Sequence, residues 1–191
     1  MCCLYYIDEA VERDIERLVN DIDKNIKLKT GDIHPTDQAP VICKRNQDLY
    51  ATSMKWGFMG RDQKPLINAR AESALEKPTF SDSVMHRRCI IPAGKFYEWN
   101  RDKQKVTFRY RESPSIYMAG FYRMDGNEPR FVILTTVANA SMRSVHDRMP
   151  LILGEKDIRL WIYEAAKTDV FLKKASPMLE RQQEYEQMSL F

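Results

Sequence analysis

Position 2 of the chain holds a cysteine, directly after the initiator methionine. A small residue there permits removal of Met1, which would give Cys2 both a free α-amine and a thiol. Reference pKa values are about 7.7–8.0 for the amine and about 8.5 for the thiol. Such an aminothiol can attack an electrophile as thiolate, or condense with an aldehyde to a Schiff base that closes to a thiazolidine. The alternative is that Cys2 is a small buried apolar residue in a first strand.

Polar residues alternate with small or apolar ones at Asn68, Arg70 and Glu72. Alternate residues of an extended strand share a face, so these three side chains would point the same way. An asparagine can hold an amine or a carbonyl by hydrogen bonds, and an arginine can grip a phosphate through its fork. The equally open alternative is a solvated face of an edge strand or loop.

A glutamate and a histidine in two later segments are candidates for proton transfer. Glu98 lies between aromatic residues in an apolar run, where desolvation disfavours the charged form and suits a general acid or base. His146 lies in a polar cluster with Asp147 and Arg148. An imidazole there can carry protons near neutral pH, and Arg148 is a second candidate phosphate ligand. The alternatives are a glutamate on the exposed face of a half-buried strand and a capped turn before Pro150.

Hydrophobic periodicity predicts the elements that position these residues. Apolar residues recur at spacings of three and four within residues 8–28, which indicates an amphipathic helix. Residues 29–40 and 55–64 carry turn-forming or charged residues and predict loops. A second helix is predicted over residues 155–166, with one apolar side formed by Ile158, Trp161 and Ile162. Runs rich in β-branched and aromatic residues predict strands at 41–43, 49–54, 89–91, 95–99, 106–110, 116–122 and 131–137.

Successive strands without βαβ alternation favour an α+β fold with a mainly antiparallel, barrel-like sheet and a few helices. The chain of 191 residues contains no repeat or convincing linker, so a single domain is predicted over residues 1–191, with a polar tail from about residue 177. Apolar residues make up 43% and charged residues 30%. This composition excludes collagen-like, membrane-spanning and wholly disordered chains.

The net charge is small, because 30 basic residues face 27 acidic ones, which gives +3. A nucleic-acid partner would therefore have to bind a local patch. The four cysteines are Cys2, Cys3, Cys43 and Cys89. A core-rich chain with a charged beginning instead of an apolar leader favours free thiols in a cytoplasmic protein. Neither the cysteine nor the histidine spacing fits a metal site, and no cofactor is predicted.

Four segments, taken in order, resemble the SRAP family (SOS response-associated peptidase domain). They are Cys2 after Met1, INARAE at 67–72, RCIIPAGKFYEW at 88–99 and VHDRMPLIL at 145–153. The resemblance spans roughly residues 2–165. It implies a strongly curved antiparallel sheet with flanking helices. It also implies an activity, in which the protein crosslinks to abasic sites in single-stranded DNA and shields the lesion during DNA repair in the SOS response.

The resemblance also implies roles for four residues. Cys2 would form a thiazolidine with the aldehyde of the ring-opened sugar. Asn68 would orient its amino group, Glu98 would assist proton transfers, and His146 would assist opening of the sugar ring.

DNA binding is implied for Arg70 and Arg148 at phosphates, and for Trp56 as an aromatic that stacks on a base. The chain departs from the family at Cys3 and Leu4, where the family has Gly and a DNA-contacting Arg.

Two other functions remain open from the sequence. One is an N-terminal cysteine (auto)peptidase, and the other is a non-catalytic single-stranded DNA-binding module. A fourth interpretation is a cytosolic domain of unassigned function in which Cys2 is simply a buried core residue. For the crosslinking function we expect a monomer that binds neither metal nor membrane, located in the cytoplasm and at the nucleoid when bound to DNA. Schiff-base chemistry could also cleave DNA as a lyase side activity.

Overall fold

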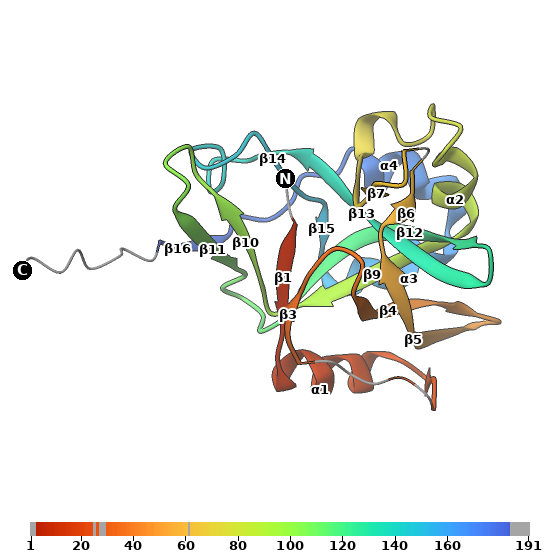
Figure 1. The fold of residues 1–191 in the computed structure, drawn as a ribbon. Helices are drawn as coiled ribbons and strands as arrows, with labels where there is room; N and C mark the ends of the chain where they lie inside the picture. Colours follow the sequence, from red (N-terminus) through yellow and green to blue (C-terminus); the bar gives the residue numbers. More distant parts are fainter. Residues whose placement is uncertain (1–2, 25, 27–29, 61, 184–191) are drawn as a thin grey trace, which may run out of the picture.

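The centre of the molecule is a closed barrel of five strands (Figure 1). The computed structural model describes residues 3–24, 26, 30–60 and 62–183. The barrel strands pair antiparallel in the order β13-β12-β9-β4-β5, and a parallel contact between β5 and β13 closes the ring. Their bounds are β4 (Gln38–Arg45), β5 (Asp48–Trp56), β9 (Arg88–Ala93), β12 (Ile116–Asp125) and β13 (Glu128–Val137). The predicted α+β class with a barrel-like, mainly antiparallel sheet is confirmed.

A second sheet of five strands lies beside the barrel, in the order β16-β11-β10-β1-β3. Apolar residues alternate along its strands, so one face, which carries Tyr5, Phe96 and Phe108, is completely buried. The register places Leu4 of β1 opposite Tyr97 of β10. The bounds are β1 (Leu4–Ile7), β3 (Gly31–Ile33), β10 (Lys95–Trp99), β11 (Lys105–Arg109) and β16 (Glu180–Gln183).

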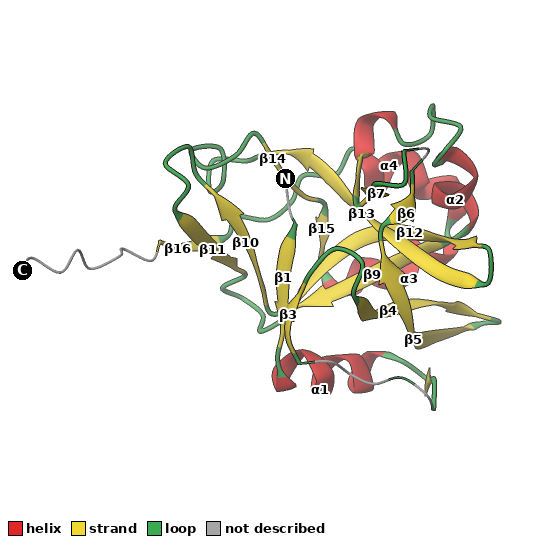
Figure 2. Ribbon diagram, viewed as in Figure 1, coloured by secondary structure: helices red, strands yellow, loops and turns green. Residues whose placement is uncertain are grey.

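Short elements surround these two sheets (Figure 2). The short strands are β2 (Asp21–Ile22), β6 (Phe58–Met59), β7 (Pro65–Leu66), β8 (Asn68–Arg70), β14 (Arg148–Pro150) and β15 (Ile152–Leu153). The helices are α1 (Glu9–Leu18), α2 (Ser81–His86), α3 (Ile158–Tyr163) and α4 (Thr168–Leu172). Three single 3₁₀ turns cover Ala71–Ser73, Glu155–Asp157 and Ala165–Lys167. None of the helices among the described residues has the length and apolar character needed to cross a membrane.

The first predicted helix begins where expected but ends earlier. Asp8 caps α1, because its carboxylate accepts hydrogen bonds from the backbone of Ala10 and Val11. The helix ends at Leu18, since the chain beyond it pairs with β5 through β2. Tertiary pairing therefore replaces the last part of the predicted helix.

The predicted loop at 29–40 is wrong in part, because it contains β3 and the start of β4. The loop predicted at 55–64 contains the last residues of β5 and all of β6. The seven predicted strands are all present, and β10 has the predicted bounds. The helix predicted at 155–166 consists of α3 between two 3₁₀ turns, and its apolar side is buried as expected.

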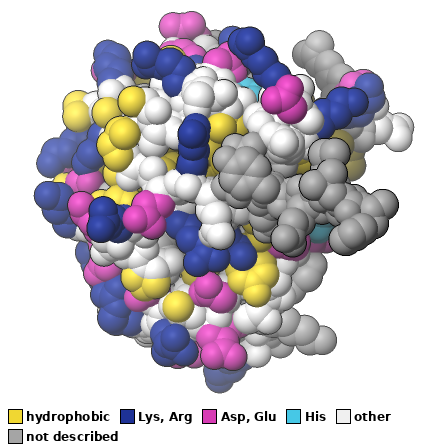
Figure 3. All heavy atoms as spheres, turned by 90° about the vertical axis from the view of Figure 1, so that its left-hand side faces the viewer, with side chains coloured by type: hydrophobic (Ala, Val, Ile, Leu, Met, Phe, Trp, Pro, Cys, Tyr) yellow, Lys and Arg dark blue, Asp and Glu magenta, His cyan; other side chains and the backbone are white. Residues whose placement is uncertain are grey.

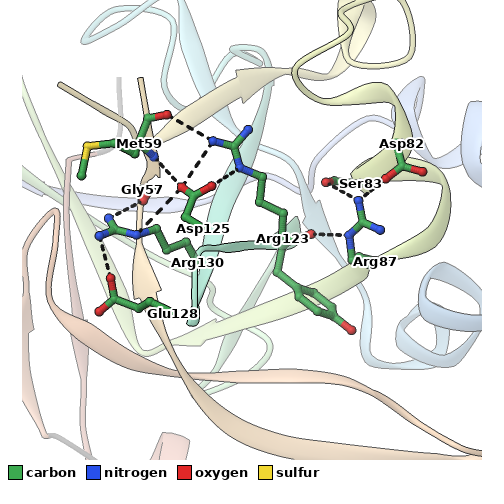
Figure 4. A network of polar contacts seen from close by, with 10 residues as sticks. Gly57, Met59, Asp82, Ser83, Arg87, Arg123, Asp125, Glu128 and Arg130 are labelled. Atoms are coloured by element: carbon green, nitrogen blue, oxygen red, sulfur yellow. Dashed lines mark hydrogen bonds and ion pairs between the residues drawn. The ribbon is translucent and has the colours of Figure 1, made fainter. Parts of the chain in front are cut away.

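A polar network joins the β12–β13 hairpin to β6 and so anchors the segment that leads to β8 (Figure 4). Asp125 accepts from Arg123 Nε at 2.6 Å and from the backbone N–H of Met59 at 2.7 Å. Arg130 donates to the carbonyl of Gly57 at 3.1 Å and pairs with Glu128 at 2.6 Å. The hairpin therefore fixes the chain at Gly57 and Met59, at the beginning of the segment that leads to Asn68.

Candidate functional site

The beginning of β1 and the end of β10 form one side of the candidate site. Cys2 lies outside the described residues, but the β1–β10 register leads Cys3 towards the position opposite Glu98. Burial, together with the negative charge of Glu98, raises the pKa of the Cys3 thiol. Glu98 itself is only 4% exposed, so the alternative of a glutamate on a solvated face is wrong. A buried carboxyl group thus lies beside the start of the chain.

Asn68 and Arg70 are held on β8, which runs parallel to β13. Asn68 is half-buried opposite Ile133, whereas Arg70 is exposed. The expected alternation does not continue to Glu72, because β8 ends at Arg70 and a 3₁₀ turn begins at Ala71. The turn directs the Glu72 carboxylate to Arg148 instead.

Arg148 connects this segment to the loop that contains His146. Its guanidinium forms a two-pronged ion pair with Glu72, at 2.6 and 2.8 Å, and donates to the carbonyl of Thr135 at 2.7 Å. The Thr135 hydroxyl in turn donates to the carbonyl of Ala69 at 3.3 Å. Arg148 is 8% exposed, and its guanidinium is occupied by these protein partners. The sequence, by contrast, predicts a phosphate ligand at this position.

His146 lies directly before β14, in the loop that follows β13. Its Nδ1 is 2.9 Å from the backbone nitrogen of Arg148 and 2.9 Å from a carboxylate oxygen of Asp147. A neutral ring accepts from Arg148 and carries its proton on Nε2, whereas a protonated ring donates to Asp147. Nδ1 thus has a partner in either state, which suits a residue that gains and loses a proton.

A cleft of about 420 Å³ lies between the end of β10 and this loop. Trp99 connects the two sides, because it follows Glu98 on β10 and shares the cleft with His146. The lining residues are Trp99, Asn100, Arg101, Arg143, Ser144, Val145, His146 and Asp147. Glu98 is thus the residue before the one that lines the cleft, and it does not line the cleft itself. Arg148 links His146 to the segment that carries Asn68.

Trp56 cannot stack on a base, which corrects the sequence prediction. Its side chain is 0% exposed and its ring packs against Tyr5 and Phe131, with centroids 5.1 and 6.2 Å away. Its Nε1–H donates to the carbonyl of Ile67 at 3.0 Å. Trp56 therefore supports the chain next to Asn68 from inside the barrel.

Trp99 is a functional candidate that the sequence prediction missed. It is 37% exposed and is therefore the aromatic residue of the cleft that can offer a ring to a nucleobase. The signal in the sequence that could have identified Trp99 was its position directly after Glu98, a residue already predicted to belong to the site. Among the described residues there is no group of three or more metal-ligating side chains.

The Glu72–Arg148 pair predicts a pH-dependent contribution to stability. The hydrogen bond from Arg148 lowers the pKa of the Glu72 carboxyl. A carboxyl group whose pKa is lowered by folding stabilises the protein at pH values above its unfolded-state pKa of about 4.3. This stabilisation is lost as the pH falls through the pKa that the group has in the folded protein. Glu72→Gln is therefore expected to destabilise the protein at neutral pH, with a difference from wild type that shrinks in acid. Urea unfolding across this range measures it, and a pH-independent difference would contradict the pairing.

Comparison with known proteins identifies relatives over most of the chain. Residues 1–190 match the family model described as SOS response associated peptidase (SRAP). Abasic site processing protein YoqW of Bacillus subtilis (strain 168) is 35% identical over 157 residues, which cover 71% of this chain and 70% of that protein. Abasic site processing protein YedK of Escherichia coli (strain K12) is 30% identical over 177 residues, which cover 85% and 79%. A solved protein structure from Bordetella bronchiseptica has the same fold, with a TM-score of 0.82 at 21% identity over 96% of this chain and 100% of that one.

Proposed function

Because the chain belongs to the SOS response associated peptidase (SRAP) family, we propose that it processes abasic sites by linking itself to them through Cys2. The observation that carries this proposal is the buried Glu98 beside the start of β1, next to a cleft that contains His146. Relatives that match 71% and 85% of this chain are named abasic site processing proteins. For a protein with this substrate we expect a cytoplasmic location, at the nucleoid when it is bound to DNA.

The proposed reaction begins with removal of Met1 and opening of the sugar. The Nε2–H of a neutral His146 assists opening of the deoxyribose hemiacetal to the aldehyde. The Cys2 amine adds to the aldehyde carbon, and the carbinolamine loses water to give an imine. The thiol then adds across the C=N bond, so that its sulfur joins the carbon and its proton passes to the nitrogen. The product is a thiazolidine, with one water released and no oxidant needed.

Three side chains support this sequence of steps. Glu98 moves protons at the amine, because it is buried beside the beginning of β1. Asn68 orients the amine and the adduct by hydrogen bonds. Capture of the imine by the thiol diverts the Schiff base from the elimination that would cleave the DNA.

The DNA is proposed to bind as a single strand, because a base-paired duplex would hide the sugar. Arg70 is exposed at the end of β8 and can grip a phosphate. Trp99 takes the stacking role that Trp56 cannot fill. Arg148 is assigned to positioning, since Glu72 and Thr135 occupy its guanidinium.

The test is incubation of the protein with single-stranded DNA that contains one abasic site, followed by denaturing electrophoresis. A covalent band that depends on the lesion is the expected result, with removal of Met1 verified by intact mass. Salt-sensitive binding without a covalent product would instead support a non-catalytic binding module. Turnover of generic peptides without DNA would support the peptidase.

A further inference from the structure

The outward face of the second sheet combines basic and aromatic side chains in register. Its members come from alternate positions of three neighbouring strands, so they share one side of the sheet. We call its basic and aromatic members the basic face: Tyr6, Lys95, Tyr97, Trp99, Lys105 and Arg109. Tyr97 in the middle is buried, as are Leu4 and Thr107 on the same side, so the accessible part consists of the two lysines, Tyr6, Trp99 and Arg109. The opposite side of the same strands is the buried apolar side.

Two of the three cations of the basic face, Lys95 and Lys105, lie over aromatic rings. Lys95 Nζ is 4.4 Å from the ring centre of Tyr6 and 5.6 Å from that of Tyr97. Lys105 Nζ is 3.9 Å from the ring centre of Tyr97. Across residues 3–24, 26, 30–60 and 62–183, no carboxylate forms an ion pair with Lys95, Lys105 or Arg109. Glu180, which adjoins Arg109 on β16, pairs with Arg111 at 3.5 Å.

Within the described part of the chain, the three cations of this face have no carboxylate that neutralises them. Figure 3 looks onto the side of the molecule that carries β11 and β16 and shows Lys and Arg side chains spread across it, with acidic ones between them. The two lysines of the basic face contact rings instead of carboxylates. A ligand for it must therefore supply negative charge.

The basic face is continuous with the cleft of the candidate site. Trp99 belongs to both, since it lines the cleft and stands opposite Lys105 in the β10–β11 register. Arg101 and Arg143 line the cleft on the other side of Trp99. Positive charge thus extends from the cleft, past an exposed indole ring, along ~13 Å of β10 to Lys95.

We propose that the basic face binds the single-stranded DNA that continues from the lesion in the cleft. This inference rests on the proposed function, because the cleft supplies the point from which the strand leaves. Single-stranded DNA offers phosphates to the row of cations and unstacked bases to the exposed aromatic ring. An acidic protein segment would offer the negative charge but no base that stacks on the ring. The face would determine how much DNA beyond the lesion adds to affinity.

The test compares undamaged and abasic oligonucleotides that are either trimmed closely around the central position or extended on one side, 5′ or 3′. Wild-type protein is expected to bind the extended strand of one polarity more tightly than the trimmed one. The double variant Lys95→Glu/Lys105→Glu should lose this advantage. Its slope of log affinity against log salt should fall by about 1.4, which corresponds to two phosphate contacts at about 0.7 each.

A double variant with the same change of charge is the matched control. Lys156→Glu/Lys167→Glu changes two exposed lysines near the helices α3 and α4, and it should keep the advantage of the extended strand. Thermal unfolding verifies that both variants are folded. Equal affinity of wild type for trimmed and extended strands, or an equal loss in both variants, would overturn the inference. A missing covalent band with trimmed abasic DNA would instead overturn the proposed function, because that substrate does not reach the basic face.

Discussion

Replacing Cys2 by alanine is expected to abolish the covalent product with abasic single-stranded DNA, because the variant lacks the thiol that closes the thiazolidine. The α-amine remains after removal of Met1, so a transient imine can still form and hydrolyse. Denaturing electrophoresis after a long incubation measures the stable product. Trapping with a hydride reductant should then recover a band from the variant, which would show that the amine and the thiol act in separate steps.

Cys3 provides the internal control, since it is the thiol nearest to Cys2 in the sequence. Burial and the charge of Glu98 raise the pKa of the Cys3 thiol, so this group stays protonated and weakly nucleophilic at neutral pH. Cys3→Ala is therefore expected to retain the covalent band. A stable band in Cys2→Ala that disappears in the double variant would refute the assignment of Cys2 and transfer the chemistry to Cys3.

The strands were predictable because each combines local propensity with a side that must be buried. In β10 the aromatic residues favour a strand, Phe96 is buried on one side, and the prediction matched the bounds of the strand. The chain after Leu18 and the strand β3 were not predictable in this way. Their backbone pairs with distant strands, and such pairing leaves no periodic signal in a short polar segment.

The candidate site shows the same division between local and long-range information. The residue types around Glu98 and His146 suggested proton transfer, and in the structure His146 lines a cleft together with Trp99, the residue after Glu98. The surroundings of Trp56 gave the wrong impression, because Lys55 and Gly57 beside it suggest a loop, whereas its ring packs against Tyr5 and Phe131. The partner of Arg148 is 76 residues away, so no spacing rule could have identified it.

Arg148→Ala is expected to combine a loss of stability with a loss of reaction rate. The buried guanidinium joins Glu72 and Thr135, and its removal leaves a carbonyl and a half-exposed carboxylate without their partner. We expect the free energy of unfolding to fall by about 2–4 kcal/mol. Displacement of the His146 loop from the Asn68 segment should slow crosslinking on the order of 100-fold. Urea unfolding and single-turnover crosslinking at saturating DNA measure the two effects.

Glu72→Gln separates positioning from phosphate binding by Arg148. If the arginine grips a phosphate, removal of the competing carboxylate charge should leave DNA affinity unchanged or increase it, and Arg148→Ala should reduce the salt slope by about 0.7. If Arg148 positions the loop, both variants should slow the saturated rate while the half-saturating DNA concentration stays constant. Arg148→Lys tests the geometry, because an ammonium keeps the charge but cannot bridge both carboxylate oxygens and the Thr135 carbonyl in one plane. The structure favours positioning, since the guanidinium is paired inside the protein before any DNA arrives.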